Sequence, residues 1–165
     1  MNNLILIGMP GAGKSTVGVV LAKVLQYSFV DSDLVIQNEE GKRLCEIIEQ
    51  EGLDGFLRIE NRINAGLQAQ RSVIATGGSV VYGREAMEHL QSIGKIVYLK
   101  LSYETLKTRL GDLRNRGVAI KDGQSLLDLY RERAALYEKY ADITVETDGL
   151  SIEETVNEIT RQYGE

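Results

Sequence analysis

A glycine-rich loop ending in lysine and serine is the part of this 165-residue chain most directly tied to chemistry. The loop follows an apolar run at residues 4–7 and matches G-x-x-x-x-G-K-S from Gly8 to Ser15. Successive backbone N–H groups of such a loop point at phosphate oxygens, and the following helix N-terminus adds its dipole. Lys14 would reach the β- and γ-phosphates and the Ser15 hydroxyl would bind Mg²⁺. The pattern therefore predicts binding of a nucleoside triphosphate.

Two aspartates, Asp31 and Asp33, close the next extended run. Side chains two positions apart in an extended segment project to the same side. Beside a phosphate loop, Asp31 could hold the metal through water while Asp33 takes the proton of an acceptor hydroxyl. The alternative is a turn or a helix cap, in which Asp33 would cap the next helix.

Paired glycines and a polar, arginine-bearing segment follow later in the chain. Gly77 and Gly78 end the run at residues 72–76, where they allow close backbone approach to a ligand or simply form a bend. Residues 111–124 carry three glycines and two arginines between predicted helices, which is typical of a mobile lid over phosphates. Arg116 in this segment is a candidate for stabilising γ-phosphate charge. Arg62 and Arg131 are interpreted as solvated helix residues.

The composition indicates one globular domain spanning residues 1–165. The chain has 43% hydrophobic and 26% charged residues, a net charge of −5 and a pI near 5.1. This acidic balance argues against a nucleic-acid surface. A single cysteine, Cys45, excludes an intrachain disulfide, and the lone His89 disfavours zinc or histidine chemistry. No signal peptide or membrane-length apolar run is found, so we expect a cytoplasmic protein without a membrane partner.

Short β-type runs alternate with helical patterns along the chain. Such alternation predicts a three-layer α/β/α fold with parallel strands and ligands at their carboxyl ends. The predicted strands are residues 4–8, 28–31, 72–76, 95–101 and 142–146. The predicted helices are residues 14–26, 33–38, 44–51, 53–70, 84–92, 103–109, 125–140 and 152–163.

The order and spacing of these motifs resemble the shikimate kinase family over nearly the whole chain. The resemblance rests on the phosphate loop, D-S-D, a segment with Phe56, Arg58 and Glu60, A-T-G-G-S, a glycine-arginine lid and R-x-x-L-Y at residues 133–137. It implies a P-loop kinase fold with a five-stranded parallel sheet. It also implies transfer of the ATP γ-phosphate to the 3-hydroxyl of shikimate with Mg²⁺, in aromatic amino acid biosynthesis.

The resemblance also implies a set of site residues. Those expected at the ATP phosphates are Gly11, Ala12, Gly13, Lys14, Ser15 and Thr16. Arg109 is expected against the adenine, Arg116 comes down with the lid, and the metal has Ser15 and, through water, Asp31. Those expected at the substrate are Asp33, Arg58, Gly77, Gly78 and Arg133. Asp33, as general base, is the catalytic residue together with Lys14 and Arg116.

The sequence departs from the family pattern at four places. Leu57 occupies the position of the family's arginine and Arg58 follows it, about 100° further round a helix. Arg58 therefore points differently unless a local shift restores its place. Ser79 replaces a third glycine, Gly117 replaces the proline after the lid arginine, and Ala135 replaces a proline before L-Y.

Two other functions remain compatible with the sequence. A kinase of the same fold could act on another small hydroxy acid, polyol or sugar acid. A catalytically reduced nucleotide-binding module could serve as a regulatory partner. If the chain is a shikimate kinase, as the resemblance implies, we expect a monomeric enzyme whose partners are ATP and shikimate or a similar acid.

Overall fold

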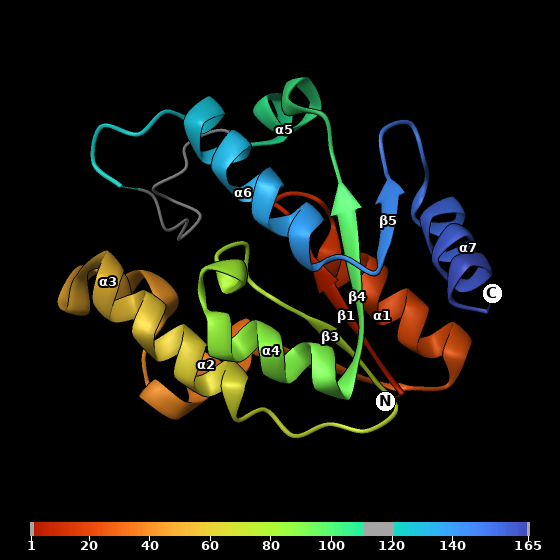
Figure 1. Ribbon diagram of the computed structural model, residues 1–165, viewed down its shortest axis with the longest axis horizontal. Helices are drawn as coiled ribbons and strands as arrows, with labels where there is room; N and C mark the ends of the chain where they lie inside the picture. Colours follow the sequence, from red (N-terminus) through yellow and green to blue (C-terminus); the bar gives the residue numbers. More distant parts are fainter. Residues whose placement is uncertain (1, 111–120, 165) are drawn as a thin grey trace.

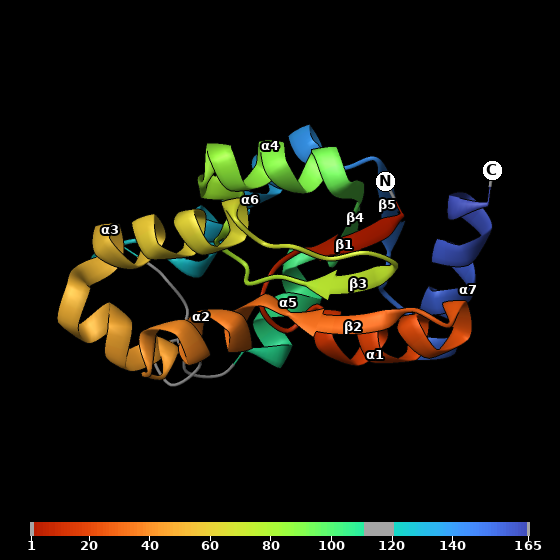
Figure 2. The same ribbon diagram turned by 90° about the horizontal axis from the view of Figure 1, so that it is seen from below.

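The structure is a computed structural model that describes residues 2–110 and 121–164. Five parallel strands form one sheet in the order β2-β3-β1-β4-β5. The strands are β1 (Asn3–Ile7), β2 (Ser28–Asp31), β3 (Ser72–Ala75), β4 (Gly94–Lys100) and β5 (Ile143–Glu146). All five lie within about a residue of the predicted ranges; Figure 1 shows β1, β3, β4 and β5, and Figure 2 also shows β2.

Helices cover both faces of the sheet, so the predicted three-layer α/β/α fold is confirmed. Helix α1 lies on one face and α4 on the other (Figure 2). The helices are α1 (Lys14–Leu25), α2 (Ser32–Glu40), α3 (Leu44–Ala65), α4 (Arg84–Ile93), α5 (Tyr103–Arg109), α6 (Leu126–Tyr140) and α7 (Ile152–Tyr163), with a 3-10 turn, η1 (Val80–Tyr82). The turn η1 was not predicted.

The core forms around the central strand, β1. Its residues are fully or almost fully buried because β3 and β4 flank it and helices cover both faces. In register, Ile5 of β1 lies opposite Ile74 of β3 and Ile96 of β4. A buried parallel strand reads as a continuous apolar run, which is why the sequence indicated it clearly.

Helix α3 consists of two helical segments joined at a kink, as the sequence predicted. It bends at Gly52, whose φ of 74° and ψ of 173° lie outside helical values. Beyond the bend, Phe56 and Ile63 belong to a second apolar cluster with Ile36 of α2 and Ile47. This cluster holds α2 and α3 together beyond the sheet (Figures 1 and 2).

The amino ends of three central strands are joined by one buried side chain. The Asn3 amide donates to the carbonyls of Ala69 and Ile93, at 2.9 Å each, and its oxygen accepts from the N–H of Ser72 at 2.9 Å. Asn3 is 1% exposed. One amide thus aligns the start of β1 with the segments that lead into β3 and β4.

The two predicted helix caps are present, whereas the predicted surface position of His89 is not. Ser151 and Glu154 form the predicted capping box of α7, and Ser102 caps α5 as predicted. His89, predicted to lie at the surface, is half-buried, with its Nε2 2.6 Å from the Leu67 carbonyl.

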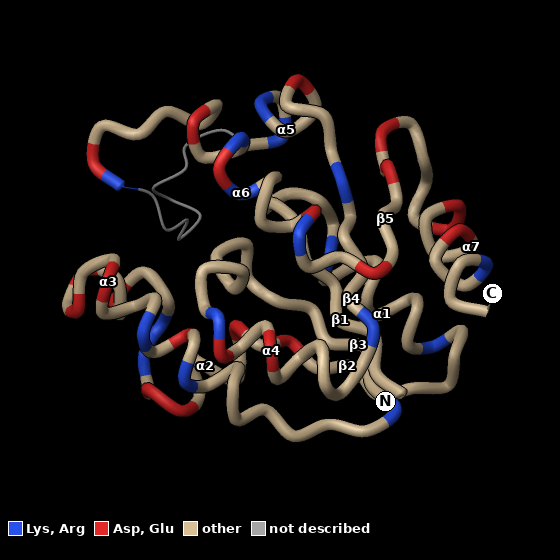
Figure 3. The backbone as a smooth tube through the Cα atoms, in the orientation of Figure 1, with Lys and Arg blue, Asp and Glu red and all other residues tan. Residues whose placement is uncertain are grey.

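Charged residues of both signs are interspersed along the surface helices (Figure 3). Arg62, predicted to be a solvated residue, pairs with Glu40 at 2.9 Å and is 63% exposed. Within residues 2–110 and 121–164, no helix combines the length and apolar character needed to cross a membrane.

Candidate active site

The phosphate loop joins β1 to α1 at the carboxyl edge of the sheet. Gly8 has a φ of 149°, and a Cβ there would lie 2.7 Å from the backbone oxygen of Leu99. Only glycine fits so close to the neighbouring strand. Gly13, with a φ of 85°, immediately precedes α1, so the loop leads directly into the N-terminus of that helix. The predicted geometry of a phosphate cradle is therefore present.

Lys14 is folded back over the loop. Its Nζ donates to the carbonyls of Gly8, at 2.7 Å, and Met9, at 2.9 Å. The pKa of Lys14 is lowered to about 8, mainly by burial and also by the charge of Arg133, while the carboxylates of Asp33 and Asp31 oppose the decrease. A pKa near 8 leaves the ammonium group protonated in most molecules at neutral pH.

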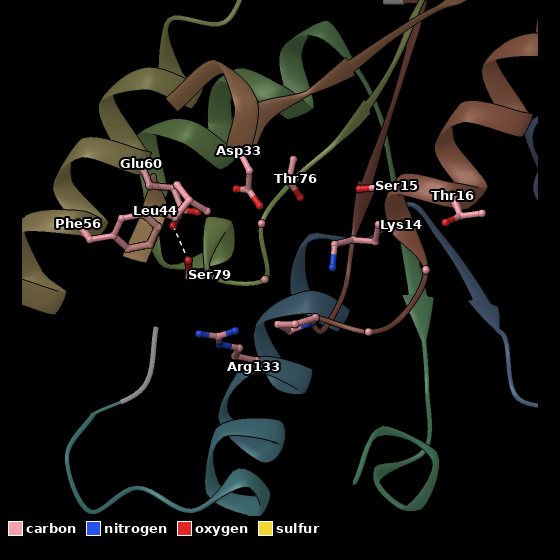
Figure 4. Close-up of a pocket in the computed structure, with 15 residues that line it drawn as sticks. Lys14, Ser15, Thr16, Asp33, Leu44, Phe56, Glu60, Thr76, Ser79 and Arg133 are labelled. Carbon is pink, nitrogen blue, oxygen red and sulfur yellow. Dashed lines mark hydrogen bonds between the residues drawn. The ribbon is translucent and has the colours of Figure 1, made fainter. Parts of the chain in front are cut away.

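The two carboxylates of the D-S-D segment have different surroundings: one caps a helix and the other lines the pocket. The Asp31 side chain caps α2 by accepting from the N–H groups of Asp33, at 3.0 Å, and Leu34, at 3.4 Å. The helix cap predicted as an alternative role is therefore formed, but by Asp31 rather than Asp33. Asp33 is the second residue of α2 and turns its carboxyl toward the pocket (Figure 4).

The Asp33 carboxyl has an unusual environment. Its Oδ1 is buried and has no hydrogen-bond partner in the described part of the chain. Burial, with a smaller contribution from Asp31, raises the pKa of Asp33 to about 6, while Lys14 opposes the shift. The group is thus basic for an aspartate yet ionised at neutral pH, as a general base requires.

The loop after β3 passes directly beneath these carboxyls. A Cβ on Gly77 would lie 2.7 Å from Asp33 Oδ1 and 3.0 Å from Glu60 Oε2. Thr76 anchors the loop to the sheet, because its hydroxyl donates to the Leu6 carbonyl at 2.8 Å. The two glycines predicted to approach a ligand therefore border the pocket, and Gly77 leaves room between two acids.

Arg133 reaches the pocket from α6 and is 1% exposed. Its guanidinium lies 5.5 Å from the centre of the Tyr82 ring and bonds to the hydroxyls of Tyr82 and Tyr137. The Tyr137 hydroxyl also lies 2.5 Å from the Gly78 carbonyl and donates to it. Two tyrosines thus fix the position of a buried cation beside the glycine loop.

Glu60 faces the same space from α3 and is 2% exposed. Its Oε1 accepts a hydrogen bond from the Ser79 hydroxyl at 2.6 Å (Figure 4). Burial raises the pKa of Glu60 to about 7; the Asp33 charge adds to the increase, while Ser79 and Arg133 oppose it. Glu60 is therefore a carboxyl group in balance between its neutral and charged forms near pH 7.

These groups surround one pocket of about 340 Å³. Figure 4 shows the phosphate loop on one side, with Asp33, Glu60 and Arg133 converging from three helices. The lining residues are Pro10, Gly11, Gly13, Lys14, Ser15, Thr16, Asp33, Leu44, Phe56, Glu60, Thr76, Gly77, Gly78, Ser79 and Arg133. A phosphate-binding loop, an acid suited to proton transfer and a buried arginine thus share one cavity.

Three expected ATP-side or metal-side residues lie near this pocket without lining it. Ala12 is buried in the loop, and Asp31 caps α2. Arg109 is exposed and donates from Nη1 to the Gly11 carbonyl at 3.0 Å. Arg116 and most of the predicted lid, residues 111–120, lie outside the described residues.

Arg58 is not brought to the pocket, contrary to the expectation from the sequence. It is exposed on α3 and borders a separate hollow with Asp54, Asn61 and Tyr82. Its neighbour Leu57 packs against the second apolar cluster. Because α3 is regular here, no local shift rotates Arg58 toward the site, and the helical offset of one residue keeps it outside.

Comparisons with known proteins agree with this geometry. A model of the family "Shikimate kinase" matches residues 10–163. The chain belongs to the shikimate kinase family. A shikimate kinase of Francisella tularensis subsp. novicida (strain U112) is 38% identical over 162 residues, 96% of this chain and 92% of the relative. Membership makes the chain a kinase that uses ATP and phosphorylates a hydroxyl group.

Solved structures of the family have the same architecture. The shikimate kinase from Acinetobacter baumannii in complex with shikimate is 32% identical, with a TM-score of 0.88 over 99% of this chain and 93% of that one. The enzyme from Aquifex aeolicus is 30% identical, with a TM-score of 0.83 over 98% and 96%. The shared fold extends over the whole length of this family member.

Glu60 was quoted for the family resemblance but was not counted among the site residues, and Tyr137 was interpreted only as a packing residue. A signal for Glu60 was present, because Phe56, Glu60 and Ile63 recur at helical spacing on the buried stripe of α3. A carboxylate on an otherwise apolar stripe indicates a functional group. For Tyr137 the packing role is confirmed by its ring contact with Tyr98, at 5.0 Å between centroids, but its hydroxyl also serves the site.

Proposed function

We propose that this pocket binds shikimate against the γ-phosphate of ATP and transfers that phosphate to the 3-hydroxyl of shikimate. The observation that carries the assignment is that the phosphate loop, Asp33 and Arg133 line a single cavity. Lys14 lies on the donor side, close enough to Asp33 that the charge of this carboxylate raises the pKa of Lys14. Donor and acceptor would therefore meet without a large rearrangement of the described residues.

The donor side is assigned to the loop and the start of α1. Gly11, Gly13, Ser15 and Thr16 line the pocket and would surround the phosphates, while the exposed Arg109 would lie against the adenine. Lys14 would leave its two carbonyl partners for the β- and γ-phosphate oxygens.

Mg²⁺ suits the oxygen groups on this side of the pocket. The Ser15 hydroxyl lines the cavity, and Asp31 has one carboxylate oxygen, Oδ2, outside its helix-capping bonds. Mg²⁺ in kinases is held by one or two such protein oxygens together with substrate phosphates and water. When bound, the ion would neutralise charge on the transferring phosphoryl group.

Asp33 is assigned as the general base. The acceptor oxygen would attack the γ-phosphorus, the bond to the β–γ bridging oxygen would break, and the proton would pass to the Asp33 carboxylate. The Asp33 carboxyl lines the pocket, and its raised pKa favours uptake of the proton. ADP and the phosphorylated acid would then leave.

Arg133 is assigned to the substrate carboxylate. A planar guanidinium can pair with a carboxylate through two parallel hydrogen bonds, and its burial strengthens them. Tyr82 and Tyr137 hold it in place before substrate arrives. Because Arg58 is outside the pocket, Arg133 would carry this recognition without help from α3.

Steady-state kinetics with shikimate and ATP test these assignments. We expect D33N to lower kcat by about 100-fold or more, since a general base contributes two to four orders of magnitude. R133K should raise the KM for shikimate at least about 10-fold and leave the KM for ATP nearly unchanged. R131K, an exposed exchange on the same helix, is the matched control. Turnover of another hydroxy acid but not of shikimate by the wild-type enzyme would replace the proposed acceptor.

We also infer that residues 1–165 act as one kinase domain and as a monomer. The groups assigned to the donor and the acceptor, Lys14, Asp33 and Arg133, line one pocket of a single chain, which supports this. Sedimentation at the enzyme concentration of the assay tests this. A dimer that dissociates together with loss of activity would contradict it.

A further inference from the structure

The loop after β3, residues 76–79, which we call the acceptor loop, lies directly against the phosphate loop. A Cβ on Gly78 would lie 2.8 Å from Pro10 Cδ and 2.8 Å from Arg133 Nη1. Gly78 therefore fits between the phosphate loop and α6 only because it has no side chain. The loops assigned to the phosphate donor and to the acceptor thus touch each other through backbone and ring atoms.

The hydroxyl of Tyr137 lies at this contact. Tyr137 belongs to α6 and is fully buried. Its hydroxyl donates to the Gly78 carbonyl at 2.5 Å and lies 3.7 Å from Met9 Sδ. It also accepts a hydrogen bond from the Arg133 guanidinium. One hydroxyl therefore contacts the phosphate loop, the acceptor loop and the arginine assigned to the substrate acid.

Met9 connects this contact to the lysine of the phosphate loop. The Lys14 ammonium donates to the Met9 carbonyl at 2.9 Å, and Met9 is 3% exposed. A short path therefore runs from Lys14 through Met9 and Tyr137 to Gly78. Buried groups packed this closely have little room to move independently, so the position of one loop constrains the other.

The ring of Tyr137 is held separately from its hydroxyl. It packs on the Tyr98 ring of β4, with 5.0 Å between the centroids. Phenylalanine at position 137 would keep this ring contact and would remove only the donor to Gly78 and the contact with Met9. The hydroxyl can therefore be tested without disturbing the core.

We propose that Tyr137 is a positioning residue whose hydroxyl holds the acceptor loop in place against the phosphate loop, so that the acceptor hydroxyl is aligned with the γ-phosphate. This rests on the proposed function, which assigns donor and acceptor to these two loops. Phosphoryl transfer requires the attacking and leaving oxygens to lie roughly in line with the phosphorus. Tyr137 touches no reacting atom, so its effect is on the efficiency of transfer.

Two rates measured on the same enzyme test this directly. One is transfer to shikimate with both substrates saturating, and the other is slow hydrolysis of ATP without shikimate, in which water attacks the γ-phosphorus and releases ADP and phosphate. Y137F should lower the rate of transfer about 10- to 100-fold, since small misplacements of reacting groups have effects of this size. Hydrolysis should change less than about 2-fold, because water needs no alignment by the acceptor loop.

The ratio of transfer to hydrolysis separates positioning from other roles. A purely structural role would lower the amount of folded enzyme and reduce both rates equally, leaving the ratio unchanged. An effect through Arg133 alone would raise the KM for shikimate and leave the ratio at saturation unchanged. Positioning by Tyr137 lowers the ratio and leaves the KM for ATP as it is.

Y130F is the matched control for the exchange. Tyr130 lies on the same helix, and its hydroxyl also donates to a backbone carbonyl, that of Leu101, at 2.7 Å. It bonds to neither loop, so Y130F should keep the ratio of the wild-type enzyme. M9L, which keeps the side-chain volume and removes only the sulfur contact, should lower the ratio about 3-fold.

The outcomes separate this inference from the function on which it rests. An equal ratio in Y137F and wild-type enzyme, or an equal fall in Y130F, overturns the proposal. If calorimetry shows that Y137F does not bind ATP, an unchanged ratio in M9L overturns it instead. Wild-type enzyme that hydrolyses ATP but does not phosphorylate shikimate contradicts the proposed function, and the same two rates with the acid that it does phosphorylate then decide the role of Tyr137.

Discussion

At Gly77, one hydrogen atom lies where any other residue would place a carbon between two carboxyl groups. Asp33 and Glu60 approach this point from α2 and α3, and the side chains carry no bulk between them. Functional acids in proteins are tuned by such local environments, here mainly by burial. The closeness of Gly77 to these two acids and the burial of Glu60 each lead to a prediction.

G77A should block the acceptor side while sparing the nucleotide side. The new methyl group would lie under 3.0 Å from Asp33 Oδ1 and would occupy the space assigned to the acceptor hydroxyl. We expect the KM for shikimate to rise about 10-fold or more and the KM for ATP to change less than about 2-fold. G66A, where a Cβ would make only ordinary contacts of 3.7 Å or more, is the control. Equal KM values for shikimate in G77A and wild-type enzyme would contradict the assignment.

Glu60 should make stability depend on pH. Its pKa is about 7 in the folded protein and near 4.5 in the unfolded chain, so between these values only the folded state holds the proton. The free energy of unfolding therefore falls as pH rises through this window, by about 3 kcal/mol at most, and is unaffected below it.

Urea unfolding at pH 4.5 and pH 8 measures this contribution. E60Q, which cannot ionise, should lose less stability than wild-type enzyme between the two pH values, whereas E49Q, an exposed exchange on the same helix, should follow the wild type. The difference between variant and wild type isolates Glu60 from Asp33, whose pKa is also raised. Parallel pH profiles for E60Q and wild type would show that Glu60 is ionised throughout.

At the scale of elements, the bend in α3 is what brings an acid to the pocket. The second part of this helix carries Phe56 and Glu60, both of which line the cavity, while its first part packs on α2. The sequence predicted two helices because Gly52 interrupts the pattern, and the bend does lie at Gly52. The two helical segments pack as a unit because Ile47 and Phe56, one from each segment, share one apolar cluster with Ile36 of α2.

G52A should weaken both stability and acceptor binding. A φ of 74° with a ψ of 173° is open to glycine almost alone, so alanine should cost about 1–3 kcal/mol. The strain should also shift Glu60 and raise the KM for shikimate several-fold. In G41A, at a left-handed residue with φ 66° and ψ 26° that ends α2, the cost should be near 1 kcal/mol with an unchanged KM. Similar KM values in both variants would separate the bend from the site.

At the scale of the whole molecule, the carboxyl ends and the amino ends of the strands have different roles. The carboxyl edge carries the pocket, whereas the amino edge carries Asn3, which joins segments leading into three strands. Parallel α/β sheets commonly place ligands at the carboxyl edge, which is why the site could be located before any contact was known.

N3A should reduce stability without changing catalysis. It leaves two half-buried carbonyls and one buried N–H without their partner, which we expect to lower the free energy of unfolding by about 3 kcal/mol. N2A removes one exposed bond to the Arg71 N–H and should cost less than about 1 kcal/mol. Chemical unfolding gives both values, and kinetics at low temperature should show unchanged KM values. A raised KM for shikimate in folded N3A would contradict this division.

The strands and the donor side could be predicted because their signals are local. Apolar runs marked β1 and β4, and the phosphate loop carries its chemistry in adjacent residues. The acceptor side depends on contacts between distant segments. The bond between Glu60 and Ser79 joins residues 19 apart, and the exposure of Arg58 depends on its rotation about α3. The one-residue offset of Arg58 indicated that its side chain points elsewhere unless a local shift restores it, and only the structure shows that no shift occurs. The acid on the apolar stripe of α3 was a usable signal for Glu60, but its bond to Ser79 could not be predicted from residue types.

The lysine of the phosphate loop leaves a last consequence. Its ammonium group has two oxygen partners, both backbone carbonyls. A phosphate that binds Lys14 would replace neutral acceptors by charged ones, and hydrogen bonds to charged acceptors are the stronger ones. A nucleoside without phosphates carries no such acceptor, so Lys14 would favour nucleotides over nucleosides.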